Sequence, residues 1–489
     1  MTPGWRQPVP VLAALAALTL LRLIVAAVVP LSPDEAYYWV WSRALAPGYL
    51  DHPPMVALWI RAGTWLAGDG ALGVRLLGPL SAALGSLLLA DAAEQLLPGR
   101  GAGWRAAALL NATLFLGVGA VTMTPDTPLL FFWTLALWAL ARIAAGGGAG
   151  WFIAAGLAAG LALASKYTAA FLGLGILLWL LAVPDLRRWL ARPAPWLGAL
   201  AAGAVFAPVV LWNAAHGWAS FAKQGGRVGD WNPARAMQFL GELTGAQIGL
   251  ATPLVFLLCA GGVVLAARRA WRTRDAGWTL LVALTVPAVA VFVQHAFGDR
   301  VQGNWPAIVY PAAAIAAAGL AGPVWHRLFR PALALGLVIT LVVYAQAALA
   351  PLPANLDPTA RLLAGWPGFA AEVDAMAARQ HADFIAADQY GIAAELARSS
   401  LAGMPVLGVE RRWAAFDLPA AAIDGRRGIL VRSLRRGADV DVTPWADITE
   451  IGRVNRERAG VVVEAYRIYS VLGRAGGTAS VRLPRPDEK

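Results

Sequence analysis

The sequence predicts a mostly helical protein that crosses a membrane many times and ends in a small α/β domain. Hydrophobic residues make up 58% of the 489 residues and only 14% are charged, whereas soluble globular proteins carry about 25% charged residues. Apolar stretches of spanning length recur as far as residue 350 and then stop. These observations exclude a soluble globular protein.

About eleven apolar stretches are long enough to span a bilayer, which takes roughly 17–25 residues. The first is expected to be an uncleaved transmembrane helix, because its apolar part is too long for a signal peptide. Lys166 divides the region 151–183 into two stretches. The stretches are 8–29, 71–97, 104–122, 127–145, 151–165, 168–183, 196–213, 246–267, 277–297, 305–321 and 331–350.

Arginines in the connecting segments predict the orientation of the helices. They fall on alternate sides of successive stretches and so gather on the side of the N-terminus, which the positive-inside rule assigns to the cytoplasm. The formal net charge of +11 is explained in this way, and nucleic-acid binding is not expected. The arginines are Arg6, Arg100, Arg105, Arg142, Arg187, Arg188, Arg192, Arg268, Arg269, Arg272, Arg274, Arg327 and Arg330.

The long apolar stretches stop after Ala350. We therefore expect two domains, 1–350 in the membrane and 351–489 outside the cytoplasm. Residues 366–380 and 391–398 are predicted to be helices, and 382–388, 428–432 and 460–470 are predicted to be strands. The single cysteine, Cys259, leaves no disulfide within the chain. A phosphate-binding loop is also missing, because Gly146-Gly147-Gly148 lacks the lysine and hydroxyl that such a loop needs. A chain without such a loop is not expected to use ATP or a nucleotide sugar, and an activated substrate carried on a lipid could take their place.

Two adjacent carboxylates, Asp34 and Glu35, follow the first apolar stretch. Ser32-Pro33 before them is a helix-entry signal, so they could stabilise a helix start. Ionisable groups at membrane depth are costly and usually functional. We therefore expect Asp34 to act as a general base on the acceptor.

Asp51 and His52 precede Pro53-Pro54 in the same loop. Asp and His can bind a metal, although two ligands do not make a site. His216 and His295 are the other histidines that could share this side of the membrane. The alternative is a rigid turn in which His52 forms local hydrogen bonds, so a divalent ion at Asp51 and His52 remains one of two hypotheses.

Asp126 stands between two prolines, and Lys166 interrupts about 30 residues of apolar sequence. Asp is common in turns, and a lysine can extend to the membrane interface. At bilayer depth, however, the carboxylate of Asp126 indicates function, and Lys166 could bind a phosphate as a point charge.

Further cations are expected on the same side of the membrane. Arginine suits bidentate contacts with phosphate, and lipid headgroups are the alternative partners. These cations are Lys223, Arg227 and Arg300.

Together these motifs resemble the membrane-embedded glycosyltransferases that use polyprenyl-phosphate sugars. This is the GT-C fold, in the superfamily of the protein O-mannosyltransferases and the lipid A aminoarabinose transferases. The matching residues are Asp34-Glu35 with Tyr37 and Tyr38, Asp51-His52-Pro53-Pro54, Pro125-Asp126-Thr127-Pro128, Ser165-Lys166-Tyr167-Thr168, Asn304-Trp305-Pro306 and the segment from Asp388 to Leu396.

The resemblance implies an inverting hexosyl- or pentosyltransferase with Asp34 as the catalytic base and Asp126 as the second acid. The block at Asp51 occupies the place where relatives carry an acidic or basic residue before a double proline. In aminoarabinose transferases that area holds a metal, but the residues here differ. The substrate-binding residues are then expected to be Glu35, Tyr37, Tyr38, His52, Lys166, Arg227, Arg300 and Asn304.

The expected function is sugar transfer from a polyprenyl-phosphate donor to a lipid, glycan or protein acceptor on the extracytoplasmic face of a bacterial-type inner membrane. The main alternative is a transporter or flippase of a lipid-linked substrate, which would need polar residues along several spans and a repeat of halves. A non-enzymatic scaffold is the second alternative. The gathering of polar residues at one face favours the enzyme.

Overall fold

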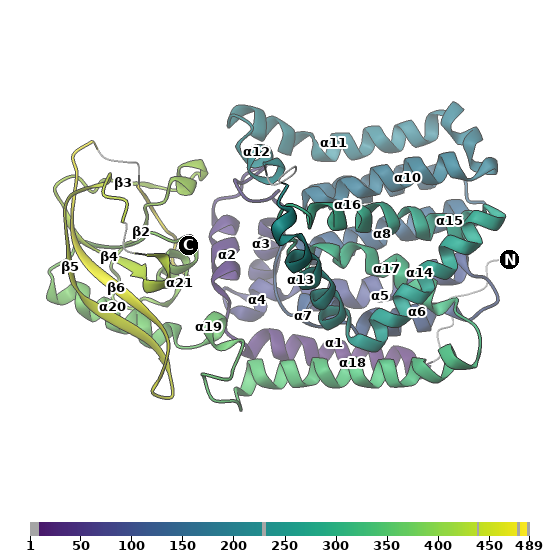
Figure 1. The fold of residues 1–489 in the computed structure, drawn as a ribbon. Coiled ribbons are helices and arrows are strands. Elements are labelled where there is room, and N and C mark those ends of the chain that lie inside the picture. Colours follow the sequence, from purple (N-terminus) through teal and green to yellow (C-terminus); the bar gives the residue numbers. More distant parts are fainter. Residues whose placement is uncertain (1–8, 227–230, 438–439, 477–479, 487–489) are drawn as a thin grey trace. The chain divides into compact units, whose positions relative to one another are not determined.

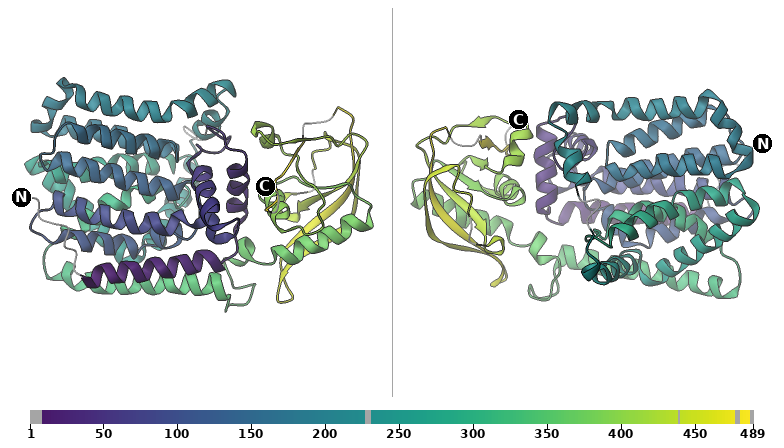
Figure 2. Two further views of the ribbon diagram at one scale, coloured as in Figure 1. Left: turned by 180° about the vertical axis from the view of Figure 1, so that it is seen from behind. Right: turned by 45° about the horizontal axis from the view of Figure 1, so that its top comes forward.

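Long apolar helices form most of the chain, and a seven-stranded sheet follows them near the C-terminus (Figures 1 and 2). The computed structural model describes residues 9–226, 231–437, 440–476 and 480–486. Chain contacts divide it into two units. The first contains Met1–Ala26, Asp51–Val56 and Arg75–Val343, and the second contains Ala27–Leu50, Ala57–Val74 and Tyr344–Lys489.

The first unit is a bundle of helices whose long members run roughly parallel to one another (Figures 1 and 2). α1 and α18 begin in this unit and end in the second. The helices are α1 (Val9–Val28), α5 (Leu77–Leu96), α6 (Ala102–Asn111), α7 (Leu114–Gly119), α8 (Asp126–Ala144), α9 (Gly150–Leu163), α10 (Ala170–Ala182), α11 (Pro193–Ala215), α12 (Ala219–Gly225), α13 (Pro233–Ala251), α14 (Pro253–Thr273), α15 (Ala276–Ala283), α16 (Val286–His295), α17 (Tyr310–Ala318) and α18 (Pro323–Leu349), with the 3₁₀ helices η1 (Tyr167–Ala169), η2 (Pro184–Ala191) and η3 (Trp305–Val309).

Small residues let these helices approach closely, as is usual between helices in membranes. A Cβ atom added to Gly156 on α9 would lie 1.9 Å from the carbonyl oxygen of Gly198 on α11. On α14, a Cβ added to Gly262 would lie 2.3 Å from the backbone nitrogen of Ala317 on α17. Larger side chains at these glycines would force the helices apart.

The described residues contain seven helices long and apolar enough to cross a membrane, or eight if a bent pair over 167–191 is one span. The sequence predicted about eleven spans. The difference arises because several predicted stretches are broken or short. The stretch 104–122 forms α6 and α7, 151–165 forms the 14-residue α9, and 305–321 forms η3 and α17. The exact number of spans stays a prediction.

The second unit combines short helices with the sheet. Its helices are α2 (Pro33–Arg43), α3 (Met55–Ala67, which begins in the first unit), α4 (Ala71–Arg75), α19 (Ala360–Leu363), α20 (Trp366–Arg379) and α21 (Tyr390–Ser399), with η4 (Arg411–Ala415) and η5 (Leu434–Arg436). Its strands are β1 (Phe384–Ala387), β2 (Val406–Gly408), β3 (Ala420–Ala421), β4 (Arg427–Ser433), β5 (Trp445–Arg458), β6 (Val461–Gly473) and β7 (Ser480–Arg482).

The strands lie in the order β3-β7-β2-β1-β4-β6-β5, and β1 pairs in parallel with β2 and β4 while the other pairs are antiparallel. Buried residues such as Phe384, Leu430, Trp445 and Tyr469 form the core of the sheet. The predicted α/β texture of the C-terminal region is confirmed. The two helices and three strands expected there correspond to α20, α21, β1, β4 and β6, whereas β2, β3, β5 and β7 were not predicted.

Candidate functional site

Asp126 in the first unit is held by two other polar side chains. It opens α8, and the Nζ atom of Lys166 donates to Oδ1 at 2.8 Å and to Oδ2 at 2.9 Å. The Nδ2 atom of Asn304 donates to Oδ2 at 2.7 Å. Lys166 reaches this place because it lies in an extended break between α9 and η1. Three segments far apart in sequence thus converge on one carboxylate.

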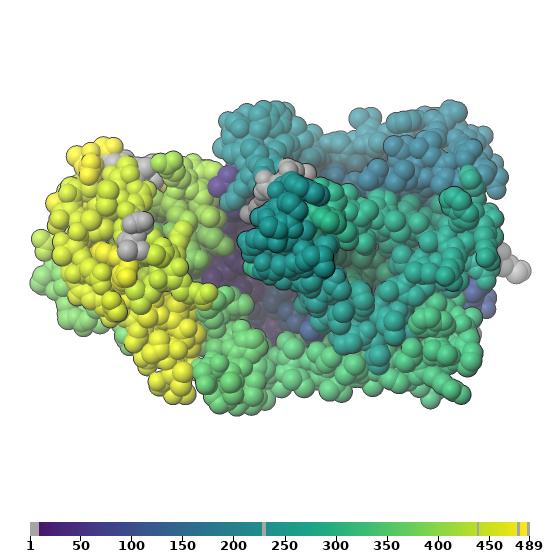
Figure 3. Space-filling view, viewed as in Figure 1, coloured from purple at the N-terminus to yellow at the C-terminus, as the bar shows by residue number. Residues whose placement is uncertain are grey.

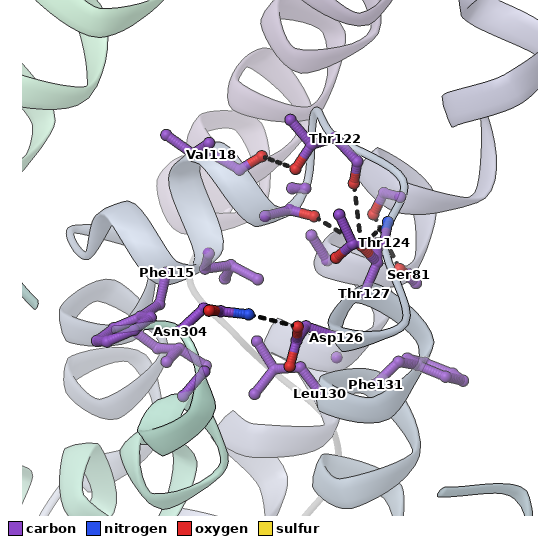
Figure 4. Close-up of a pocket in the computed structure, with 18 of the residues that line it drawn as sticks. Ser81, Phe115, Val118, Thr122, Thr124, Asp126, Thr127, Leu130, Phe131 and Asn304 are labelled. Carbon is purple, nitrogen blue, oxygen red and sulfur yellow. Dashed lines mark hydrogen bonds between the residues drawn. The ribbon is translucent and has the colours of Figure 1, made fainter. Parts of the chain in front are cut away.

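The turn before α8 does not depend on the carboxylate of Asp126. Its hydrogen bonds are made by Thr127, whose Oγ1 accepts from the backbone nitrogen of Thr124 at 3.2 Å and donates to the carbonyl of Thr122 at 2.9 Å (Figure 4). Turn chemistry therefore does not account for the acid. Since the side chains of Lys166 and Asp126 are only 8% and 18% exposed, their charges face each other with little water between them.

An apolar cavity of about 250 Å³ adjoins Asp126 within the first unit (Figure 4). Phe115, Leu130 and Phe131 are among its lining residues, and Asp126 and Asn304 lie on its wall. The cavity therefore joins hydrocarbon-like surface to a polar cluster. That combination suits a lipid chain with a charged head.

A second polar cluster of the first unit surrounds Asp51 and His52. The carboxylate of Asp51 forms an ion pair with Lys223, and its carbonyl accepts from Nε2 of Gln224 at 2.6 Å. Burial, followed by the positive charge of Lys166, lowers the pKa of His52 to about 4. His52 is therefore neutral at physiological pH, and its buried Nδ1 has no hydrogen-bond partner among the described residues.

These residues do not make a metal site of ordinary composition. One oxygen of Asp51 is already bound by Lys223. Within the described ranges, the structure brings no group of three or more His, Cys, Asp or Glu side chains together, whereas protein sites for zinc usually offer three or four.

Asp34 and Glu35 in the second unit have different surroundings. Ser32 caps α2, and Glu35 closes a capping box in which its Oε2 accepts from the backbone nitrogen of Ser32 at 3.0 Å. Glu35 is completely buried, whereas Asp34 is exposed. The capping box thus accounts for Glu35 and leaves Asp34 directed toward solvent.

Tyr390, at the start of α21, donates its hydroxyl to Oδ1 of Asp34 at 2.9 Å. Its ring lies 4.4 Å from that of Tyr37, and the guanidinium of Arg412 lies 4.1 Å from the ring of Tyr390. Tyr37 and Tyr38 are themselves buried among aromatic rings. Direct contact of these two tyrosines with substrate stays a prediction, and their observed role is to pack α2.

Arg300 lies at the surface of the first unit, with its guanidinium bound to Glu242 on α13 at 2.6 and 3.0 Å. Figure 3 shows α13 exposed on this face of the helical unit. The hydrogen bonds from Arg300 lower the pKa of Glu242. Arg227, the other predicted arginine, lies outside the described residues.

The structure therefore groups the predicted residues into two centres. Asp126, Lys166 and Asn304 share one hydrogen-bonded cluster of the first unit. Asp51 and His52 belong to the same unit but form a separate cluster with Lys223 and Gln224. Asp34 belongs to the second unit. Sequence reasoning gave Tyr390 no role, because 356 residues separate it from Asp34 and no local spacing links the two.

Comparisons with known proteins find similarity to glycosyltransferases. Residues 51–212 match the family model described as dolichyl-phosphate-mannose-protein mannosyltransferase. The lipid A galacturonosyltransferase RgtD of Rhizobium johnstonii is 28% identical over 374 residues, which cover 74% of this chain and 76% of that protein.

Solved structures share the fold. ArnT of Cupriavidus metallidurans bound to undecaprenyl phosphate superposes with a TM-score of 0.63 at 16% identity, over 95% of this chain and 98% of that one. Its apo form gives a TM-score of 0.60 at 16% identity, over 94% and 97% of the two chains. The chain therefore has the fold of the ArnT structures, and its sequence is similar to that of glycosyltransferases.

Proposed function

We propose that the protein transfers a sugar from a polyprenyl-phosphate donor to a glycolipid acceptor at the extracytoplasmic face of a bacterial inner membrane. The observation that carries this proposal is the exposed carboxylate of Asp34. It follows the first spanning helix directly and is bound by the neutral hydroxyl of Tyr390. A carboxylate exposed in this way is accessible to a substrate. The likeness to a lipid A galacturonosyltransferase favours a glycolipid over a protein acceptor.

In the proposed reaction, an oxygen of the acceptor attacks the anomeric carbon of the sugar. Asp34 takes the proton from that oxygen as the new carbon–oxygen bond forms. The bond between the anomeric carbon and the phosphate oxygen breaks, and polyprenyl phosphate leaves with the electron pair. Attack opposite to the leaving group inverts the configuration of the sugar.

The first unit is proposed to hold the donor. The apolar cavity beside Asp126 would take isoprene groups, and Lys166 would stabilise the phosphate charge that develops as the bond breaks. Lys166 is already bound to Asp126, so Asp126 would orient the ammonium group. Arg227 and Arg300 remain proposed phosphate contacts, and Glu35, Tyr37, Tyr38, His52 and Asn304 remain proposed to shape the substrate sites.

The proposed orientation places the N-terminus in the cytoplasm and the C-terminal domain, 351–489, outside it. The arginine distribution supports this assignment. Reporter fusions after residue 100 and after residue 355 should then give opposite signals. Equal signals from both fusions would refute the orientation.

The direct test uses purified full-length protein in detergent with a radiolabelled polyprenyl-phosphate sugar and a glycolipid extract. We expect labelled glycolipid and free polyprenyl phosphate to appear in equal amounts. Movement of an unchanged donor across a vesicle membrane, without cleavage, would instead show a transporter.

A divalent ion at Asp51 and His52 is tested separately by treating the enzyme with EDTA. A role for the ion would be supported if EDTA lowers the activity of the native protein, Mn²⁺ or Mg²⁺ restores it, and an Asp51→Asn variant shows no such loss. Full activity with no bound metal by elemental analysis would exclude it.

A further inference from the structure

A polar cavity of about 380 Å³ lies in the second unit and touches Asp34. It lies within the size range of small-ligand sites, about 300–1,000 Å³. The starts of α2 and α21 line it, together with three arginines, Arg361, Arg435 and Arg436. The reaction described above uses only Asp34 from this wall.

Two helix starts converge on the cavity. A Cβ atom added to Gly391 on α21 would lie 2.8 Å from the Cβ of Pro33 on α2, so glycine is needed for this approach. The side chain of Gln389 makes no cap to α21, and Glu410 accepts the backbone N–H of Tyr390. The N–H groups of Gly391 and Ile392 follow in the first turn, where no helical carbonyl is available to them. Helix starts of this kind favour anions.

Most acids around the cavity already have cationic partners. Glu464 accepts from Arg456 at 3.0 Å and from the hydroxyl of Ser433 at 2.6 Å. Asp388, which precedes the lining residue Gln389, forms an ion pair with Arg432 and lies 3.7 Å from Arg436. Asp34, which accepts from the hydroxyl of Tyr390, is the other acid that lines the cavity.

Arg361 and Arg435 are left as uncompensated cations. Both are exposed at the cavity, and neither forms an ion pair among the described residues. Two guanidinium groups therefore face one carboxylate, next to two helix starts. Arginine binds phosphate and carboxylate through paired N–H donors.

We propose that this cavity binds an anionic group of the acceptor, a phosphate or a carboxylate, and thereby places the reacting oxygen of the acceptor beside Asp34. The inference rests on the proposed function, because it assigns the acceptor to the unit that carries the base. It predicts that an acceptor without a negative charge is a poor substrate.

The first experiment measures binding without catalysis. Full-length protein in nanodiscs of neutral phosphatidylcholine is titrated with inorganic phosphate, and binding is followed by broadening of the ³¹P signal. We expect the double variant Arg361→Gln/Arg435→Gln to bind phosphate about tenfold more weakly than the native protein. The matched control is Arg453→Gln, an exposed arginine of β5 paired with Glu450, which should bind as the native protein does.

The second experiment measures transfer. In the double variant the KM for the acceptor should rise about tenfold, while the KM for the donor stays within about twofold. Arg435→Lys should recover part of the loss, because it keeps the charge and loses the paired donors. Unchanged phosphate binding and an unchanged acceptor KM in a folded double variant would overturn the proposal.

Nanodiscs with about one third phosphatidylglycerol separate an acceptor group from a lipid headgroup. If the arginine substitutions change transfer only in nanodiscs with phosphatidylglycerol, and inorganic phosphate does not bind in neutral nanodiscs, the ligand is a membrane lipid and the proposal is wrong. If phosphate binding depends on Arg361 and Arg435 but neither the native protein nor the variants transfer sugar from the donor, the anion site is supported and the proposed function is wrong.

Discussion

The two acidic centres of this protein differ in their exposure and in the hydrogen bonds that they accept. Asp126 is 18% exposed and is bound by the ammonium of Lys166 and the amide of Asn304. Asp34 is exposed at the start of α2 and accepts a hydrogen bond from the neutral hydroxyl of Tyr390. The ammonium of Lys166 binds both oxygens of Asp126, whereas the exposed carboxylate of Asp34 is accessible to a substrate. We therefore propose that Asp126 orients Lys166 and that Asp34 acts as the base.

The largest expected effect tests the Asp126 side of this comparison. Lys166→Met leaves a poorly solvated carboxylate without its cation and should lower stability by about 3–5 kcal/mol. The double variant Asp126→Asn/Lys166→Met removes both charges and should regain most of that stability. Thermal unfolding in detergent measures both variants.

Activity of the same double variant separates structure from function. If the pair only stabilises the bundle, the double variant should transfer sugar normally. We expect it to stay folded and remain impaired, because the donor phosphate loses a cation.

The second prediction concerns Asp34. Asp34→Asn keeps the shape of the side chain and removes its basicity, so transfer should fall by roughly 100-fold or more with folding intact. The control, Glu35→Gln, alters the buried capping box. It should lower stability by about 0.5–2 kcal/mol and should reduce transfer less than Asp34→Asn does. Normal turnover by a folded Asp34→Asn protein would show that Asp34 is not the general base and would favour the transporter alternative.

The third prediction extends the comparison to pH. Burial lowers the pKa of His52 to about 4 in the folded protein, below the 6.5 of an unfolded histidine. Folding then excludes a proton that the unfolded chain binds, so stability is complete above pH 6.5 and is lost as the pH falls toward about 4. Between pH 7.5 and 5 the loss should be about 2 kcal/mol.

His52→Asn should remove this part of the acid sensitivity, as measured by unfolding temperatures at the two pH values. His216 is exposed and stacks on Trp212, so His216→Gln is the control and should keep the native pH dependence. An equal loss in the His52→Asn protein would assign the acid sensitivity to other groups.

The smallest effect is expected at Tyr390. Tyr390→Phe keeps the ring packed on Tyr37 and removes the hydrogen bond to Asp34, which should lower kcat about tenfold. The KM for the donor should not change, since the donor is assigned to the other unit. A change in the donor KM without a change in kcat would show that Tyr390 does not position the base.

The sequence by itself determined the class of the protein and the local settings of its acids. Apolar length predicted a chain that crosses a membrane many times, although not the number of its long helices. Ser32-Pro33 predicted the start of the helix that carries Asp34. The α/β texture of the C-terminal region followed from short hydrophobic runs. These features depend on neighbours in the chain, so they can be predicted from one sequence.

The partners of those acids were decided only by the tertiary structure. Lys166 lies 40 residues from Asp126, Asn304 lies 178 residues from it, and Tyr390 lies 356 residues from Asp34. Each pair forms because particular ends of helices meet. Many helix arrangements bury similar apolar area, and which polar groups then coincide depends on side-chain packing that no local pattern encodes.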